Sequence, residues 1–184
     1  MHEIRWHGRG GQGAVTAAKI LADAAFRSGF AGVTSQPSFG AERRGAPITA
    51  SSRLADKPLR ILSQVTEPDI VVVLDDSLVA VANATGGMKP GGTLIVNTTK
   101  GAGDFSVRDD IRVVTSDVSG AAEAVGLIVG GQPMVSTAIL GAVARATGLI
   151  TMDSVEAAIG YAFSGSAATK NIEAAAIAYE CTRA

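Results

Sequence analysis

The feature that most constrains the fold is a glycine-rich segment near the start of the chain. Residues 3–6 alternate polar and apolar side chains, residues 7–13 read HGRGGQG, and residues 14–28 have a helical pattern without Gly or Pro. This order predicts a strand, a tight turn with the GxGxxG spacing, and a helix. Backbone N–H groups can approach a ligand closely at glycines, and the positive end of the helix dipole lies behind them. The turn is therefore predicted to bind a phosphate or another anion; the alternative is a turn that needs small residues only for packing.

A second landmark of a dinucleotide site is missing from the sequence. In dinucleotide-binding domains, an acidic side chain about 20 residues after the glycines holds the ribose hydroxyls. Here the second apolar run, residues 30–35, ends in Gln36-Pro37-Ser38, and the first carboxylate after it is Glu42. NAD binding by this chain is therefore disfavoured.

A long segment without periodicity, residues 36–47, follows that run. Glu42, Arg43 and Arg44 lie between Gly40 and Gly45 in this segment. Loops of this length inside a compact domain are usually functional, and guanidinium groups bind carboxylates and phosphates through two parallel hydrogen bonds. We expect the loop to meet an anionic ligand or a partner subunit, with a solvated charged turn as the alternative.

The rest of the chain alternates strand and helix patterns. Residues 69–74 are almost continuously apolar and β-branched, as in a central strand covered on both faces, and they end at Asp75-Asp76-Ser77. Open α/β sheets bind ligands at such strand ends, although Asp76 or Ser77 could instead cap the next helix. Further strands are predicted at 93–97 and 111–114, a small β-hairpin at 48–54 and 59–62, and helices at 78–84, 135–147, 153–163 (capped by Asp153) and 167–179. We predict one domain over residues 1–184: an α/β, Rossmann-like fold with a mostly parallel sheet flanked by helices and a helical C-terminal third.

Composition excludes several classes of protein. The net charge is -1 and no basic cluster is longer than Arg43-Arg44, which argues against nucleic acid or an anionic membrane as a partner. Uninterrupted apolar runs such as residues 70–74 are far too short to span a bilayer, and the chain does not start like a signal peptide, so we expect a cytoplasmic protein.

The side chains that could carry chemistry are few. One cysteine, Cys181, excludes an internal disulfide, a four-cysteine zinc site and a self-contained iron–sulfur cluster. His2 and His7 are the only histidines, and no motif places a nucleophile beside either of them. We therefore predict neither catalytic residues nor metal ligands here, and interpret the chain as a binding module or as one subunit of a larger enzyme.

Four segments together resemble a known family. The opening IRWHGRGGQGA (4–14), the loop FGAERRGAP (39–47), the strand PDIVVVLD (68–75) and the helix TAILGA (137–142) are similar to the gamma subunit of the 2-oxoacid:acceptor (ferredoxin) oxidoreductases, which include pyruvate:ferredoxin oxidoreductase. The resemblance covers almost the whole chain in the family's order. It identifies residues 1–184 as a single gamma-type (pyruvate/ketoisovalerate oxidoreductase) domain.

The resemblance implies an activity for the assembled enzyme and not for this chain alone. Enzymes of this family oxidatively decarboxylate a 2-oxoacid with coenzyme A to an acyl-CoA and pass electrons to ferredoxin or NAD. Thiamine diphosphate with Mg²⁺ lies between alpha and beta subunits, and a delta-type, cysteine-rich subunit carries [4Fe-4S] clusters. The gamma unit rests against them and holds none of these cofactors by itself. The 2-oxoacid stays open among pyruvate, 2-oxoglutarate, branched-chain and aryl acids such as phenylglyoxylate.

For the gamma unit, the expected role is binding and positioning. The residues expected to face coenzyme A or the thiamine adduct are Gly8, Arg9, Gly10, Gly11, Gln12, Gly13, Glu42, Arg43 and Arg44. Two alternatives are kept. Both loops could serve only as subunit contacts, or the chain could be a free-standing nucleotide-binding module or an NAD-dependent enzyme.

Overall fold

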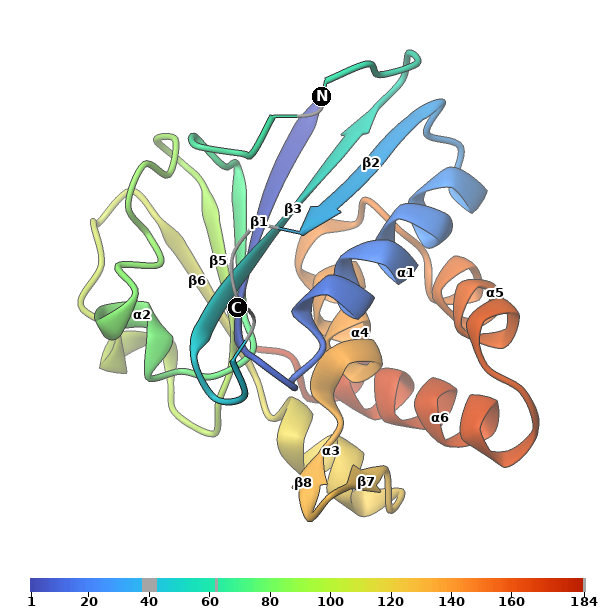
Figure 1. Cartoon of the computed structure of the whole chain (residues 1–184). Coiled ribbons are helices and arrows are strands. Elements are labelled where there is room, and N and C mark those ends of the chain that lie inside the picture. Colours follow the sequence, from blue (N-terminus) through green and yellow to red (C-terminus); the bar gives the residue numbers. More distant parts are fainter. Residues whose placement is uncertain (38–42, 62, 184) are drawn as a thin grey trace.

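The computed structural model describes residues 1–37, 43–61 and 63–183, and its main sheet has six strands in the order β2-β3-β1-β4-β5-β6 (Figure 1). The strands are β1 (His2–Arg9), β2 (Gly32–Pro37), β3 (Pro47–Ala55), β4 (Ile70–Val73), β5 (Thr93–Asn97) and β6 (Arg112–Ser116). β1, β4, β5 and β6 are parallel, and β3 is antiparallel to both of its neighbours. The predicted α/β architecture with a mostly parallel sheet is confirmed.

The helices are divided unequally between the two faces of the sheet. They are α1 (Ala14–Arg27), α2 (Leu78–Val81), α3 (Val118–Ala124), α4 (Val135–Thr147), α5 (Met152–Ala162) and α6 (Gly165–Cys181), with a 3-10 turn at Ala102–Asp104. Figure 1 shows α1, α4, α5 and α6 on one side of the sheet and the short α2 on the other. The helical C-terminal third is therefore confirmed. In the described part of the chain, no helix is both long and apolar enough to cross a membrane.

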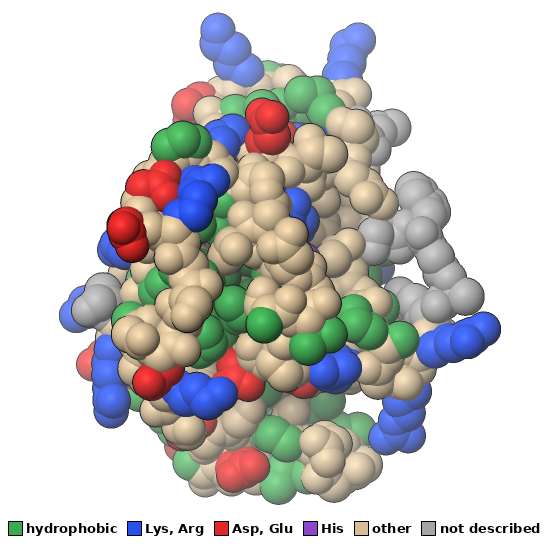
Figure 2. Space-filling view, turned by 90° about the vertical axis from the view of Figure 1, so that its left-hand side faces the viewer, with side chains coloured by type: hydrophobic (Ala, Val, Ile, Leu, Met, Phe, Trp, Pro, Cys, Tyr) green, Lys and Arg blue, Asp and Glu red, His purple; other side chains and the backbone are tan. Residues whose placement is uncertain are grey.

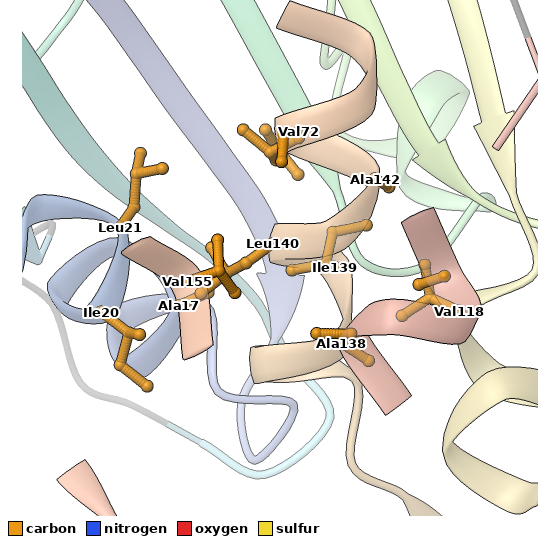
Figure 3. Packing of buried hydrophobic residues seen from close by; sticks show 14 of the residues in the cluster. Ala17, Ile20, Leu21, Val72, Val118, Ala138, Ile139, Leu140, Ala142 and Val155 are labelled. Carbon is orange, nitrogen blue, oxygen red and sulfur yellow. The ribbon is translucent and has the colours of Figure 1, made fainter. Parts of the chain in front are cut away.

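The central strand β4 has hydrophobic side chains in both layers, which explains its continuous apolar run. Val72 joins the larger cluster with Leu21 of α1 and Leu140 of α4 (Figure 3). Val71 and Val73, on the opposite face, join a smaller cluster under α2. Both faces of β4 are therefore withdrawn from water, as expected for a strand in the middle of a parallel sheet.

The helices of the larger layer approach each other closely because they are rich in small residues. A Cβ atom at Gly141 of α4 would overlap the carbonyl oxygen of Ala175 in α6. Thr137 of α4 also contacts Asn171 of α6 through a buried hydrogen bond. Gly141 therefore serves close packing between α4 and α6 within this chain.

The predicted hairpin of 48–54 with 59–62 has the wrong pairing. The first segment is β3, which pairs with β1 and β2, while residues 59–61 form no strand and Leu62 lies outside the described residues. The following segment lies against β3, where the side chain of Arg53 donates to the carbonyl of Gln64. An alternating pattern fits any half-buried strand and does not identify its partner. A small antiparallel hairpin is present elsewhere, formed by β7 (Ile128–Val129) and β8 (Gln132–Pro133).

Helix boundaries also differ from the prediction, most clearly at the start of α5 and the end of α2. α5 is capped by Thr151 and not by Asp153: the Thr151 hydroxyl accepts from the N–H of Ser154 at 3.2 Å, and Ser154 Oγ accepts from the N–H of Thr151. Two overlapping capping patterns compete in this sequence, and the upstream one prevails. α2 ends at Val81, earlier than the predicted residue 84.

Candidate functional site

The candidate site lies where the strand order of the sheet reverses direction. The chain leaves β1 toward α1 and β2 on one side, whereas β4 pairs with β1 on the other. Ligands of open α/β sheets bind in the crevice outside the carboxyl ends of strands at such a point. The glycine turn follows β1 there, and Asp75 follows β4.

Three glycines in and beside the turn are closely packed. A Cβ atom at Gly10 would overlap the carbonyl oxygen of Arg43, and one at Gly13 would lie 2.7 Å from Cβ of Ser136 in α4. A Cβ atom at Gly8 would lie 3.2 Å from both Ala14 Cβ and Leu74 Cδ1. The packing alternative therefore explains much of the glycine spacing.

Gly11 differs from these three glycines. Apart from its two chain neighbours, no described residue has an atom within 4 Å of the position of its Cβ, and its φ is 98°. Its backbone thus adopts the left-handed conformation that glycine permits, at an open position beside the site.

The N–H groups of the turn are mostly paired within the chain. Arg9 N–H donates to Gln12 Oε1 at 2.7 Å, Gln12 N–H to the Arg9 carbonyl at 2.9 Å, and Gly10 N–H to the Ala46 carbonyl at 2.9 Å. The N–H groups of Gly11 and Gly13 donate to no group in the described part of the chain. Two N–H groups of the turn before α1 are therefore left without a protein acceptor among the described residues.

Arg9 is held by its own chain. Its guanidinium donates to Asp75 Oδ2 at 2.7 Å, to Ser77 Oγ at 2.8 Å and to the Gly45 carbonyl at 3.1 Å. Burial alone would raise the pKa of the Asp75 carboxyl, but the hydrogen bonds from Ser77 and Arg9 and the charge of Arg9 lower it overall. Arg9 is thus a clamp between β1, the end of β4 and the 43–46 segment, with its charge compensated by Asp75.

The described end of the predicted arginine loop lies directly beside the glycine turn. Gly45 N–H donates to the Gly10 carbonyl at 3.0 Å, and Gly10 forms a parallel bridge with Arg44. Arg44 lines the adjoining cavity and makes no ion pair with a described residue. Arg43 is exposed outside that lining, and Glu42 lies outside the described residues.

Two cavities meet at this edge of the sheet. The first, here the glycine-loop cavity, measures about 530 Å³. It is lined by Arg9, Gly10, Gly11, Gln12, Arg44, Gly45, Leu74, Asn97, Ser119, Val129, Gly130, Gln132, Pro133, Met134 and Val135. The second, here the acidic pocket, measures about 260 Å³ and is lined by Gln12, Leu74, Asp75, Asp76, Asn97, Thr98, Thr99, Asp117 and Ser119. Two arginines therefore line the first cavity, and three aspartates line the second.

Several lining residues were not predicted from the sequence. Asn97, at the end of β5, donates to the Leu74 carbonyl and to Ser119 Oγ, both at 2.9 Å, and accepts from Ser119 N–H at 3.0 Å. The sequence could have indicated Asn97 as a site residue, because it lies at the end of a predicted strand. The β7–β8 hairpin, which forms one wall of the glycine-loop cavity, gave no such signal.

Asp76 and Ser77 were suggested as caps of α2, but their side chains bond to other groups. Ser77 has the N-cap position but makes no side-chain capping bond; its hydroxyl donates to Asp75. Asp76 accepts from the Thr98 hydroxyl at 2.9 Å and pairs with Lys100 at 2.9 Å. These side chains therefore connect the ends of β4 and β5 across the acidic pocket.

His7 is a structural residue. It is 5% exposed, and its Nε2 accepts from Arg5 Nε at 3.1 Å. Burial and the nearby charge of Arg5 lower the pKa of His7 from 6.5 to about 4. The imidazole is therefore neutral at neutral pH, and it lies outside the lining of both cavities.

The lowered pKa of His7 predicts a pH dependence of stability. Between pH 6.5 and about 4, the unfolded chain binds a proton at His7 that the folded chain does not, so stability falls as the pH falls. Between pH 6.5 and about 4.5, the wild-type chain should lose about 2–3 kcal/mol more free energy of unfolding than the His7→Gln variant. Urea unfolding at several pH values measures both slopes. Equal slopes would show that His7 titrates normally.

The sequence and the fold resemble those of known proteins. The sequence model of the pyruvate ferredoxin/flavodoxin oxidoreductase family matches residues 3–181, so the chain belongs to that family. Within it, the chain is of the gamma type: it is 50% identical over 185 residues to the pyruvate/ketoisovalerate oxidoreductases common subunit gamma of Thermococcus kodakarensis, covering 99% of this chain and 97% of that protein. Identity to pyruvate synthase subunit PorC of Methanothermobacter thermautotrophicus is 49% over 182 residues, covering 98% and 95%. The predicted resemblance is confirmed.

Solved structures agree with this assignment. The crystal structure of pyruvate oxidoreductase subunit PORC from Thermotoga maritima superposes with a TM-score of 0.82 at 33% identity, covering 99% of this chain and 97% of that one. The 2-oxoglutarate:ferredoxin oxidoreductase of Magnetococcus marinus shares the fold at 18% identity with a TM-score of 0.76, covering 98% of this chain and 30% of that longer chain. That structure has 2-oxoglutarate, coenzyme A and succinyl-CoA bound.

Proposed function

We propose that this chain is the gamma subunit of an enzyme that oxidatively decarboxylates a 2-oxoacid with coenzyme A and passes electrons to ferredoxin or NAD. Its relatives are subunits of pyruvate and ketoisovalerate oxidoreductases. In this proposal, alpha and beta subunits hold thiamine diphosphate and Mg²⁺, and a delta-type subunit holds the iron–sulfur clusters. In the described residues, no group of three or more His, Cys, Asp or Glu side chains could hold a metal ion.

Within that enzyme, the glycine-loop cavity holds the phosphates of coenzyme A. The observation that carries this role is the convergence of Arg44 and Gly11, whose N–H is unpaired in the described part of the chain, on one cavity. A phosphate fits this donor set because guanidinium groups and helix N-termini both favour anions. Arg9 contributes indirectly, because its bond to the Gly45 carbonyl holds the segment that bears Arg44. The chain therefore binds and positions, and it supplies no proton-transfer group of its own.

A partner subunit completes the cavity on its open side. Ile128 and Val129 of the β7–β8 hairpin are 50% and 62% exposed beside it. Large apolar side chains grouped at a cavity rim are typical of surfaces that another chain covers. By contrast, on the face that Figure 2 shows, acidic and basic side chains are interspersed and hydrophobic side chains form small separate areas.

Isolation of the assembled enzyme tests this function. The tagged chain, purified anaerobically from its host, should bring down thiamine- and iron-containing subunits and form acyl-CoA from one member of a 2-oxoacid panel. The architectural alternative predicts the same complex, but cavity variants would then disturb assembly and leave the KM for coenzyme A unchanged. A chain that is isolated alone, without iron and without activity, would contradict the proposal and favour a free-standing nucleotide-binding module.

A further inference from the structure

A groove lies at the end of α4 that is remote from the glycine-loop cavity. α4 begins beside that cavity, where Val135 forms part of the wall, and its 13 residues span about 20 Å. The groove, here the helical groove, measures about 490 Å³ and lies between the end of α4, the start of α5 and the end of α6. It is lined by Ala144, Gly148, Ile150, Thr151, Met152, Glu156, Ala176, Tyr179 and Glu180.

The lining of the helical groove combines apolar and acidic side chains. Ala144 and Ile150 are 4% and 3% exposed, so the deepest lining residues are apolar. Glu156 and Glu180 are exposed, and neither forms an ion pair with a described residue. Both charged residues of the lining are therefore acidic, and both carboxylates are available to a cation from outside the described chain.

Tyr179 gives the helical groove a fixed aromatic side chain. The guanidinium carbon of Arg145 lies 5.3 Å from the centroid of the Tyr179 ring, and a cation at this distance is attracted by the ring. Arg145 forms no ion pair with a described residue, so it does not neutralise Glu156 or Glu180. Aromatic side chains held in this way are typical anchors of protein–protein interfaces.

Two occupants from this protein itself are disfavoured. The described end of the chain is bonded elsewhere, because Arg183 N–H donates to the Thr115 carbonyl at 2.8 Å and accepts from the Thr115 N–H at 2.9 Å. A second copy seated on the groove about a two-fold axis would bring the same glutamates of both copies together, and like charges repel. The charge and the apolar lining instead fit a basic, partly apolar partner.

We propose that the helical groove is the docking site for an amphipathic segment of another subunit. Its apolar side chains pack against Ala176 and Tyr179, and its Lys or Arg side chains face Glu156 and Glu180. Because such docking requires a multi-subunit enzyme, it rests on the proposed function, and it adds an assembly surface remote from the coenzyme A cavity. The opposite charges orient the segment and exclude acidic competitors.

Charge variants of the groove test the proposal in the assembled enzyme. The tagged chain is purified with its partner subunits and washed at about 50 mM and about 500 mM salt. Glu156→Lys combined with Glu180→Lys should lower the amount of retained partner about tenfold at the lower salt, because attraction becomes repulsion. Glu156→Gln combined with Glu180→Gln should lower it a few-fold at the lower salt and match wild type at the higher salt, where such pairs are screened. Glu67→Lys, at an exposed position outside the groove, is the control and should retain the partner as wild type does.

A cross-link from the groove identifies its occupant. A photoreactive benzoylphenylalanine in place of Tyr179 keeps an aromatic side chain at this position and reacts with any polypeptide in contact with it. Irradiation of the complete enzyme should join the chain to a peptide of another subunit in which apolar residues alternate with Lys or Arg, as mass spectrometry would show. Cross-links only within the chain, or only to a second copy of it, would overturn the proposal.

The results also separate this proposal from the proposed function. If the wild-type chain brings down its partner subunits and both double variants retain them equally well at both salt concentrations, the groove is not the docking site and the proposed function stands. If the wild-type chain is isolated alone, the proposed function fails and the docking proposal fails with it. In enzyme that does assemble with the Gln variants, the KM for coenzyme A should be that of wild type, because the groove lies at the far end of α4.

Discussion

Replacing Arg44 by glutamate is expected to raise the KM for coenzyme A by about 100-fold in the complete enzyme. Arg44 lines the glycine-loop cavity and has no ion pair with a described residue, so its charge is available to a phosphate. A charge-assisted hydrogen bond contributes about 1.5–3 kcal/mol, and reversing the charge adds repulsion; each 1.4 kcal/mol is about tenfold in affinity. Steady-state kinetics with varied coenzyme A at saturating 2-oxoacid measures the change.

Arg43→Glu is the comparison for this variant. It introduces the same charge one residue away, on an exposed side chain outside the cavity lining. Its effect should be limited to a few-fold, because a solvated charge is screened by water and salt. Equal effects of the two reversals would indicate a general dependence on the charge of the loop and not a site formed by Arg44.

Gly10→Ala is expected to destabilise the chain and weaken coenzyme A binding together. Its methyl group would overlap the Arg43 carbonyl, and Gly10 is also bonded to Ala46 and Gly45. The segment bearing Arg44 must therefore move away from β1. The cost should be about 1–3 kcal/mol in the free energy of unfolding, with a KM increase approaching that of Arg44→Glu.

A second Gly→Ala change serves as its control. Gly160 in α5 is exposed, and outside its own helix turn no described residue has an atom within 4 Å of the position of its Cβ. Gly160→Ala should leave the KM unchanged and stabilise the chain slightly, because alanine favours a helix over glycine. Thermal unfolding measures the stability of both variants, and steady-state kinetics measures their KM for coenzyme A. A Gly10→Ala enzyme with wild-type stability and KM would contradict the described contact between the two loops.

The sequence pattern predicts the sheet well where local signals are strong. Both faces of β4 are buried, and this alone produces the uninterrupted apolar run from which the central strand was predicted. β3 shows the limit. Its alternation predicts a half-buried strand correctly, but pairing with β1 and β2 depends on contacts distant in sequence, so the predicted hairpin was wrong.

The candidate site was predictable only in part, for the same reason. The glycine turn and Arg44 lie on one cavity, as their separate patterns suggested. The clamp between Arg9 and Asp75 joins residues 66 positions apart, and the opposite wall comes from the β7–β8 hairpin. These contacts follow from the strand order, and no local sequence pattern predicts them. The role of Glu42 stays a prediction, because it lies outside the described residues.

The most direct measurement of the central claim is a structure of the assembled oxidoreductase with coenzyme A bound. The account predicts a phosphate group in the glycine-loop cavity, with oxygens about 2.7–3.2 Å from the Arg44 guanidinium and from the Gly11 N–H. Coenzyme A bound entirely on other subunits, with Arg44 contacting only protein, would contradict it. The chain would then serve assembly alone.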